Sequence, residues 1–334
     1  MPDSIYTPDP TRYTDKKMNR LGKSGLCLSP LSLGLWHNFG AIDDFSEAQK
    51  IIFKAFDSGI THFDLANNYG PPPGSAEITF GKILKDDLKN HRDEMLITTK
   101  AGWEMWAGPY GNFGSRKYLL ASLDQSLKRM GLDYVDIFYH HRPDPSTPLE
   151  ESIGALATAV QNGKALYVGI SSYSAQETLT ALQVFKQLGI PCLVHQMRYN
   201  LFSQELHTSG LDQVLVDNGV GGVCFSTLAQ GILTGKYLNG IPENSRAARP
   251  DGYLKPELIS AKQLEIVKKL TQIAQNRNQG LSEMAIAWTL QNPAVQSAII
   301  GPRTLEQLNQ NLKALDCLDF SSEELAQIQQ ICAG

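Results

Sequence analysis

Short apolar runs alternate along the chain with stretches of helical periodicity. The runs predict strands at residues 31–35, 60–64, 95–100, 134–141, 165–171, 192–196, 222–226 and 297–301. Between the first two, apolar residues recur at helical spacing from a capping-box pattern at Ser46 and Gln49 to a glycine stop at Gly59. Further helices are predicted around 76–84, over 116–131, 148–163 and 174–189, and more weakly up to Gly219. Eight strands, each followed by a helix, are typical of βα units.

The way these units repeat favours one closed barrel over a doubly wound sheet. No linker or composition shift divides the chain, and no G-x-G-x-x-G follows a strand. We therefore predict an α/β fold, a TIM (β/α)8 barrel, as a single domain over residues 18–334, with residues 1–17 forming a polar arm over the surface. The irregular stretch from Gln230 to about Glu257 is too long for an ordinary connection, which predicts a functional loop after strand seven.

Composition removes several classes of function. The 334 residues carry a formal net charge of -4 and are 42% hydrophobic, which provides no basic surface for nucleic acid. No apolar run reaches bilayer-spanning length, and the first residues lack the pattern of a secretory signal. Five scattered cysteines without a C-x-x-C pair indicate reduced thiols and a cytoplasmic protein. Neither H-x-H nor H-E-x-x-H occurs, so we predict no metal site and disfavour a metal-dependent barrel hydrolase.

Polar side chains gather where the predicted strands end. Asp64 ends the second strand, Tyr69 follows in its loop, Lys100 ends the third strand, and His140 and His141 end the fourth. The active site of a TIM barrel is built on the C-terminal ends of its strands, so these groups are expected at one mouth. Each residue alone also has a structural interpretation, as an ion pair, a loop aromatic or a core histidine.

This combination of groups indicates reduction of a carbonyl. A phenol has a pKa of about 10, which a nearby ammonium lowers and burial raises. Tyr69, next to Lys100, would donate a proton to the oxygen of a carbonyl that a histidine orients. Because the set contains no activated nucleophile, the hydride must come from elsewhere, which implies a nicotinamide cofactor.

Four segments resemble the aldo-keto reductase superfamily: "HFDLANNYG", "TTKAG", "YVDIFYHHRPDPSTPLEE" and "GILTGKY". The resemblance extends from about Met18 to Ala333. It implies a barrel that binds NADPH without a Rossmann domain and a catalytic tetrad of Asp64, Tyr69, Lys100 and a histidine. The family places this histidine just before a pair like "RPD", which points to His141 rather than His140, and period-two alternation in the strand agrees.

The resemblance also implies where NADP lies. Trp36 and Asp64 would lie at the nicotinamide end, and Ser171, Ser172 and Gln196 would hold the carboxamide. Phe225 would pack on the nicotinamide ring, and Ser226, Leu228, Gln230 and Lys236 would form the strap over the pyrophosphate. Arg303, Gln307 and Asn311 would lie at the adenosine end. An arginine at the start of a helix suits a 2′-phosphate, which favours NADP over NAD. Thr227 stands where the family usually has proline, and Arg303 where some relatives carry serine.

Longer segments, such as "LGLWHNFG" and "GKALYVGISSYS", are similar to one branch of this superfamily. That branch holds bacterial reductases of L-glyceraldehyde 3-phosphate and methylglyoxal, and it is related to potassium-channel β-subunits. The resemblance therefore implies an NADPH-dependent reductase of small aldehydes or, alternatively, a nicotinamide-binding regulatory subunit with slow redox turnover. It also implies a homo-oligomer, a tetramer or larger. Trp103 and Trp106 would line the substrate mouth or pack beneath their loop, and Arg198 would contact a substrate phosphate or face solvent.

Overall fold

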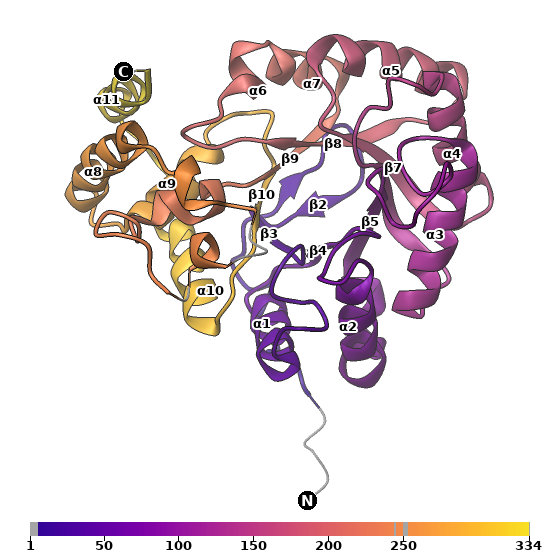
Figure 1. Cartoon of the computed structure of the whole chain (residues 1–334), viewed down its shortest axis with the longest axis horizontal. Helices are drawn as coiled ribbons and strands as arrows, with labels where there is room; N and C mark the ends of the chain where they lie inside the picture. Colours follow the sequence, from indigo (N-terminus) through magenta and orange to yellow (C-terminus); the bar gives the residue numbers. More distant parts are fainter. Residues whose placement is uncertain (1–5, 244, 250–252, 334) are drawn as a thin grey trace, which may run out of the picture.

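The chain forms a closed barrel of eight parallel strands (Figure 1). The computed structural model describes residues 6–243, 245–249 and 253–333. The strands follow one another around the barrel in the order β10-β3-β4-β5-β6-β7-β8-β9. They are β3 (Leu31–Gly34), β4 (His62–Asp64), β5 (Leu96–Ala101), β6 (Val135–His140), β7 (Ala165–Ser171), β8 (Cys192–Arg198), β9 (Gly221–Phe225) and β10 (Ser297–Ile300). The predicted TIM barrel is confirmed, and each strand lies within two residues of its predicted bounds.

A ring of helices encloses these strands, and Figure 1 shows it running from α1 and α2 through α3, α4 and α5 to α7, α9 and α10. The helices between β3 and β9 are α1 (Phe45–Asp57), α2 (Ser75–Ile83), α3 (Arg116–Met130), α4 (Leu149–Gln161), α5 (Ala175–Gln187), α6 (Glu205–Thr208) and α7 (Leu211–Asn218). A π-helical turn (Leu84–Leu88) and a 3-10 turn (Lys89–Glu94) follow α2. The weak helix predicted up to Gly219 is thus two short helices, α6 and α7, because the left-handed Gly210 separates them.

The connection after β9 is the longest of the fold. It contains three 3-10 turns, at Ala229–Thr234, Arg246–Ala248 and Pro256–Leu258, and then α8 (Ala261–Asn276) and α9 (Leu281–Thr289). Part of the predicted functional loop, residues 244 and 250–252, lies outside the described residues. After β10, the chain adds α10 (Leu305–Leu312), a 3-10 turn (Lys313–Asp316) and α11 (Ser322–Ala333). Figure 1 shows α8 and α11 beside each other, outside the ring of helices.

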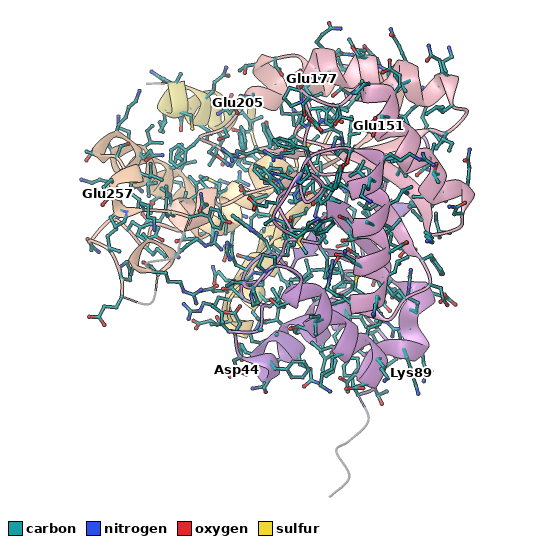
Figure 2. All side chains as sticks on the ribbon, turned by 45° about the vertical axis from the view of Figure 1, so that its right-hand side comes forward. Asp44, Lys89, Glu151, Glu177, Glu205 and Glu257 are labelled. Carbon is teal, nitrogen blue, oxygen red and sulfur yellow. The ribbon has the colours of Figure 1, made fainter. Side chains whose placement is uncertain are left out.

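The start of α1 differs from the sequence prediction. Asp44 is the N-cap residue, and its carboxylate accepts hydrogen bonds from the backbone nitrogens of Ser46 at 2.8 Å and Glu47 at 3.2 Å. The prediction that Ser46 caps this helix is therefore wrong. Asp44 caps the helix in place of Ser46 because its carboxylate accepts hydrogen bonds from two otherwise unpaired N–H groups of the first turn. Asp44 is labelled near the lower edge of the molecule in Figure 2.

The barrel interior is closed at its N-terminal end by a short hairpin. Strands β1 (Asn19–Arg20) and β2 (Cys27–Leu28) pair antiparallel, and Leu21 and Leu28 pack with Ile137, Val223 and Ile299 of the barrel strands. Strand residues that alternate with these, such as Phe138 and Ile300, pack in the layer between strands and helices. Polar side chains at the opposite, C-terminal ends of the strands are therefore left facing the open mouth.

The N-terminal segment packs against α1 over the part that the structure describes. The Tyr6 ring stacks on Phe53 with centroids 3.8 Å apart, and its hydroxyl donates to Asp57 at 2.8 Å. Arg12 forms an ion pair with Glu94 at 2.5 Å. Tyr6 and Arg12 thus connect this segment to α1 and to the 3-10 turn after α2, and the first five residues of the predicted arm lie outside the described ranges. None of the described helices combines the length and the apolar character needed to cross a membrane.

Candidate active site

Period-two alternation turns the polar strand ends into the barrel mouth. In β5, Lys100 pairs in register with Tyr139 of β6, which packs in the barrel interior. Asp64 ends β4 in register with Thr98 of β5. His141 follows β6 directly, and its backbone nitrogen donates to the Ala101 carbonyl at 2.9 Å. Three of the expected groups therefore come from three neighbouring strands.

Lys100 is the hub of this cluster. Its ammonium donates to the Asp64 carboxylate at 2.8 Å, to the Leu65 carbonyl at 2.6 Å and to the Tyr69 hydroxyl oxygen at 3.2 Å. Lysine has three donor hydrogens, so these contacts use all of them. The hydroxyl hydrogen of Tyr69 is not needed for the contact with Lys100 and is left to another acceptor.

The Asp64 carboxylate is held from its other side as well. Its second oxygen accepts from the Thr98 hydroxyl at 3.0 Å and from the Gln196 amide nitrogen at 2.8 Å. The Asp64–Lys100 ion pair is fully buried, and only 8% of Tyr69 is exposed. A buried ion pair with its remaining lone pairs satisfied is a fixed element of the site.

Burial dominates the protonation equilibria at this position. It raises the pKa of Tyr69 well above its ordinary value of 10, and the Asp64 carboxylate acts in the same direction. From the sequence we expect the Lys100 ammonium to lower this pKa, but in the structure the desolvation of the phenol outweighs that effect. Burial also lowers the pKa of Lys100, against the opposing effect of Asp64. Tyr69 is thus a neutral phenol that keeps its proton until an acceptor arrives.

The two adjacent histidines point to different places. The His141 ring meets Tyr69 edge to face, with centroids 5.8 Å apart, whereas His140 bonds through Nδ1 to the Tyr173 hydroxyl at 2.6 Å. Burial and the nearby charge of Lys100 lower the pKa of His141 well below 6.5, so its imidazole is neutral. Its Nδ1 is buried and has no hydrogen-bond partner within the described ranges. His141 is therefore the histidine beside the phenol.

The expected carboxamide contacts come from the ends of β7 and β8. Ser171 pairs in register with Gln196, and the backbone nitrogen of Ser172 donates to the Gln196 carbonyl at 3.0 Å. Ser172 has a positive φ of 63°. The amide nitrogen of Gln196 is bonded to Asp64, which joins this group to the tetrad. The structure thus brings Ser171, Ser172 and Gln196 together beside the expected catalytic residues.

The predicted strap follows β9. Phe225 ends that strand on its interior-facing register, and the backbone at Ser226 and Gln230 has positive φ angles, both of 57°. Leu228 packs partly buried against the core, and the side-chain oxygen of Gln230 is buried without a partner in the described part of the chain. A left-handed segment of this kind turns backbone N–H groups outward, as in anion-binding loops.

Three cations gather near this strap. Burial lowers the pKa of Lys236, and the charges of Arg246 and Arg303 lower it further, so each arginine lies close enough to Lys236 to repel it. Arg246 was not identified from the sequence. Its guanidinium lies 5.8 Å from the centre of the Trp36 ring, and no carboxylate of the described residues forms an ion pair with it. Its signal in the sequence was an arginine within the loop already expected to be functional.

The residues expected at the adenosine end begin α10. The Thr304 hydroxyl caps this helix by accepting from the backbone nitrogen of Gln307, and the Gln307 side chain accepts from the backbone nitrogen of Arg303 at 2.9 Å. Asn311 lies one turn further and is buried. Gln307 thus shapes the turn that carries Arg303. Near the other end, Trp36 packs on Tyr253, with ring centroids 5.1 Å apart.

The loop after β5 supplies one wall of the mouth. Trp103 meets the His141 ring edge to face at 6.3 Å, and Arg142 stacks on Trp103 at 3.8 Å. Trp106 packs instead on Tyr118, with centroids 5.3 Å apart. Of the two tryptophans, Trp103 therefore lies at the site and Trp106 beneath its loop. Arg198 is exposed where β8 ends. The described residues contain no group of three or more His, Cys, Asp or Glu arranged for a metal ion.

Comparison with known proteins agrees with this geometry. The profile of the Aldo/keto reductase family matches residues 30–333. The chain is 54% identical over 329 residues to the L-glyceraldehyde 3-phosphate reductases of Escherichia coli O157:H7 and of Escherichia coli strain K12. Each match covers 98% of this chain and 95% of the relative. The chain is therefore a member of the aldo-keto reductase family and an oxidoreductase.

Proposed function

We propose that this enzyme uses NADPH to reduce small aldehydes and 2-oxoaldehydes, with L-glyceraldehyde 3-phosphate and methylglyoxal as substrates. The observation that carries the proposal is the buried Lys100 ammonium, which contacts Asp64 and Tyr69 together beside a neutral His141. The names of the two Escherichia coli relatives support the phosphorylated aldehyde. The 54% identity over nearly the whole length of both chains makes a shared substrate class a reasonable inference.

The cations at the strap fit a dinucleotide that carries an extra phosphate. Arg246 and Arg303 both repel Lys236, and an anion bound beside Lys236 would relieve that repulsion. Arg303 lies at the start of α10, where the helix dipole also favours negative charge. Ser171, Ser172 and Gln196 would hold the carboxamide, and Phe225 would pack on the ring. When bound, the nicotinamide would supply a hydride to the carbonyl carbon of the substrate.

The proton comes from Tyr69. As the carbonyl carbon accepts the hydride, its oxygen takes the phenolic proton and becomes the hydroxyl of the product. The phenolate left on Tyr69 lies 3.2 Å from the Lys100 ammonium, which offsets the new charge. A neutral His141 donates an N–H to the carbonyl oxygen and polarises it before the proton moves. Asp64 keeps Lys100 charged and in place.

All five cysteines are unpaired, which suits a reducing compartment, and we place the enzyme in the cytoplasm. We also expect a homo-oligomer of four or more subunits, since the same family resemblance suggests it. Sedimentation of the purified protein tests the assembly directly.

A substrate panel tests the activity. L-glyceraldehyde 3-phosphate, its D isomer and methylglyoxal are each assayed with NADPH and with NADH, and kcat/KM is compared. The proposal expects many turnovers per enzyme, with the highest kcat/KM for an aldehyde of this panel with NADPH. Tight NADPH binding with at most a single slow turnover would point instead to a regulatory subunit of the channel β type.

A further inference from the structure

Behind the candidate site, three buried polar residues lie outside the barrel wall and take no part in the proposed chemistry. His140 ends β6, Tyr173 follows β7, and His195 lies in β8. Their exposed fractions are 0%, 3% and 0%. In the barrel register, His140 pairs with Ile170 and Ile170 pairs with His195. The two imidazoles therefore lie in one row, on either side of β7.

Tyr173 forms hydrogen bonds with both histidines. Its hydroxyl lies 2.6 Å from Nδ1 of His140, and its backbone carbonyl accepts from Nε2 of His195 at 3.1 Å. One link thus joins β6 to β7 through a side chain, and the other joins β7 to β8 through the backbone. We call His140, Tyr173 and His195 the rim brace.

Each member of the rim brace is next in sequence to a residue of the candidate site. His140 precedes His141, Tyr173 follows Ser172, and His195 precedes Gln196. Successive side chains of a strand point to opposite faces, so fixing the outer residue also fixes the direction of the inner one. The brace therefore acts on the same strand ends that carry the polar groups of the mouth.

The imidazole of His140 has little freedom to move away. A Cβ atom at Gly114 would come within 2.7 Å of His140 Nε2, so the ring is packed against this glycine. The Ser152 hydroxyl of α4 donates to the Gly114 carbonyl at 2.7 Å, which holds the glycine in place. The ring is thus wedged between the loop after β5 and Tyr173. Burial lowers the pKa of both His140 and His195 to about 4, so both bonds are between neutral groups at pH 7.

We propose that the members of the rim brace are positioning residues for the reduction: the β6–β7 link sets His141, and the β7–β8 link sets Gln196. This inference rests on the proposed function, because it assigns each link to one part of that function. The first link bears on the orientation of the carbonyl, and the second on the grip on the nicotinamide carboxamide. The two links can therefore be broken separately.

Two substitutions break one link each. Tyr173→Phe removes the hydroxyl and keeps the ring and the carbonyl, so we expect kcat to fall about 10-fold while the Kd for NADPH stays within about 2-fold. His195→Leu removes the second link, so we expect the Kd for NADPH to rise about 10-fold while kcat at saturating NADPH stays within about 2-fold. Loss of kcat and affinity in equal proportion in both variants would overturn the assignment. Tyr6→Phe, which also loses a phenolic hydrogen bond but lies against α1, is the matched control and should change neither value.

A rescue experiment separates the hydrogen bond from the packing. The amide of asparagine reaches about the same position as Nδ1 of histidine. His140→Asn therefore keeps a partner for Tyr173, whereas His140→Leu does not. We expect the Asn variant to retain most of the wild-type kcat and the Leu variant to match Tyr173→Phe. Equal kcat in the two His140 variants would contradict the brace, and this comparison also decides the matter if Tyr173→Phe does not fold.

A last measurement is independent of turnover. Amide hydrogen exchange in the segment 138–143 should be faster in Tyr173→Phe than in wild type, because the end of β6 is no longer held. Unchanged exchange there would overturn the brace even if activity falls. If the wild-type protein reduces no carbonyl, the proposed function fails, and this exchange comparison still decides whether the brace orders the strand end.

Discussion

The Lys100 ammonium donates its three hydrogens to Asp64, to Leu65 and to Tyr69. The proton that the site can transfer to a substrate is therefore that of the Tyr69 hydroxyl. The Tyr69 hydroxyl accepts from the ammonium, so its own hydrogen is free to point toward a bound carbonyl. Burial raises the pKa of the phenol, which means the proton leaves only as charge develops on the substrate oxygen. The residue is thus arranged as an acid whose conjugate base is stabilised locally.

Removing that hydroxyl should stop proton transfer and little else. For Tyr69→Phe we expect kcat to fall about 10²- to 10⁴-fold, the usual contribution of a general acid, with the Kd for NADPH within about 2-fold. Single-turnover kinetics and a fluorescence titration with NADPH measure the two effects. Tyr139→Phe is the matched control, since its hydroxyl is buried nearby without a hydrogen-bond partner in the described part of the chain. Turnover of Tyr69→Phe close to wild type would refute the role.

At the scale of elements, the strap and the start of α10 bring basic side chains together from distant parts of the sequence. Lys236 and Arg246 come from the connection after β9, and Arg303 comes from the turn after β10. A cluster of this kind reads a phosphate through charge-assisted hydrogen bonds. Its members differ in burial, because Arg303 is exposed and Arg246 is not.

Arg303→Ala should therefore weaken NADPH binding far more than NADH binding. We expect the Kd for NADPH to rise about 10- to 100-fold, and that for NADH to change by less than about 3-fold, since only NADPH carries the 2′-phosphate. Arg20→Ala removes the same charge from the hairpin at the closed end of the barrel and serves as the control. Equal weakening of both coenzymes would show that Arg303 does not read this phosphate.

A second link between elements sets the charge next to Lys100. Glu77, in the first turn of α2, is fully buried and accepts from the Thr99 hydroxyl of β5 at 2.6 Å and from Arg129 at 2.6 Å. Its carboxylate helps to raise the pKa of Lys100 against the effect of burial. The start of α2 also holds the backbone at Tyr69, because the backbone nitrogens of Gly74 and Ala76 both donate to the Tyr69 carbonyl. Glu77 thus ties the loop of the phenol to the strand of the lysine.

Replacing this carboxylate by an amide should shift the pH dependence of catalysis. In Glu77→Gln the pKa of Lys100 falls further, so the alkaline limb of kcat/KM moves to lower pH than in wild type. Arg129→Met breaks the same ion pair but removes a positive charge, so its alkaline limb should not move in that direction. A pH profile from 6 to 10 for both variants, with the exposed Asp86→Asn as control, distinguishes an electrostatic effect from damaged packing. An unshifted limb in Glu77→Gln would contradict this role.

Strand ends were the informative elements in the sequence. Asp64, Lys100 and His141 could be placed because buried apolar runs set their strands. The family resemblance pointed to His141 rather than His140, and alternation in the strand agreed with it. The hairpin β1–β2 was not predicted from the sequence, because two-residue strands leave no periodic signal. Ser46 and Asp44 are both good caps, and only the fold shows which one meets the first turn.

Contacts between elements could not be predicted from the sequence for a different reason. Arg246 lies in an irregular connection, where no period fixes the direction of a side chain, and Arg303, which acts on the same Lys236, is far away in sequence. The rim brace depends on the register between three strands, which a single sequence does not specify. The direction of the Tyr69 pKa depends on the balance of burial and charge, and only the packed site provides both.

At the scale of the whole molecule, several histidines are buried as neutral groups. His62, His140 and His195 are fully buried, and burial lowers the pKa of each to about 4 from 6.5. His62 lies between the Ser32 and Thr98 hydroxyls and near the opposite charges of Asp64 and Lys100. None of the three gains a carboxylate partner close enough to restore its basicity. Their protonation therefore acts on the fold as a whole.

These shifts predict a steep loss of stability in mild acid. Between pH 6.5 and 4 the unfolded chain binds a proton at each of these histidines and the folded chain does not, so the free energy of unfolding falls as the pH falls. Each group contributes up to about 1.4 kcal/mol per pH unit. His141, whose pKa burial also lowers, is a fourth such group, so the four together contribute roughly 5 kcal/mol per unit near pH 5, against a total stability of about 5–15 kcal/mol. Urea unfolding at intervals from pH 7.5 to 4.5 measures this slope. His62→Asn should reduce it by about one quarter, since one of four titrating groups is gone, whereas the same change at the exposed His207 should not reduce it. A stability that stays level down to pH 4.5 would show that the buried imidazoles are not held neutral in the folded state.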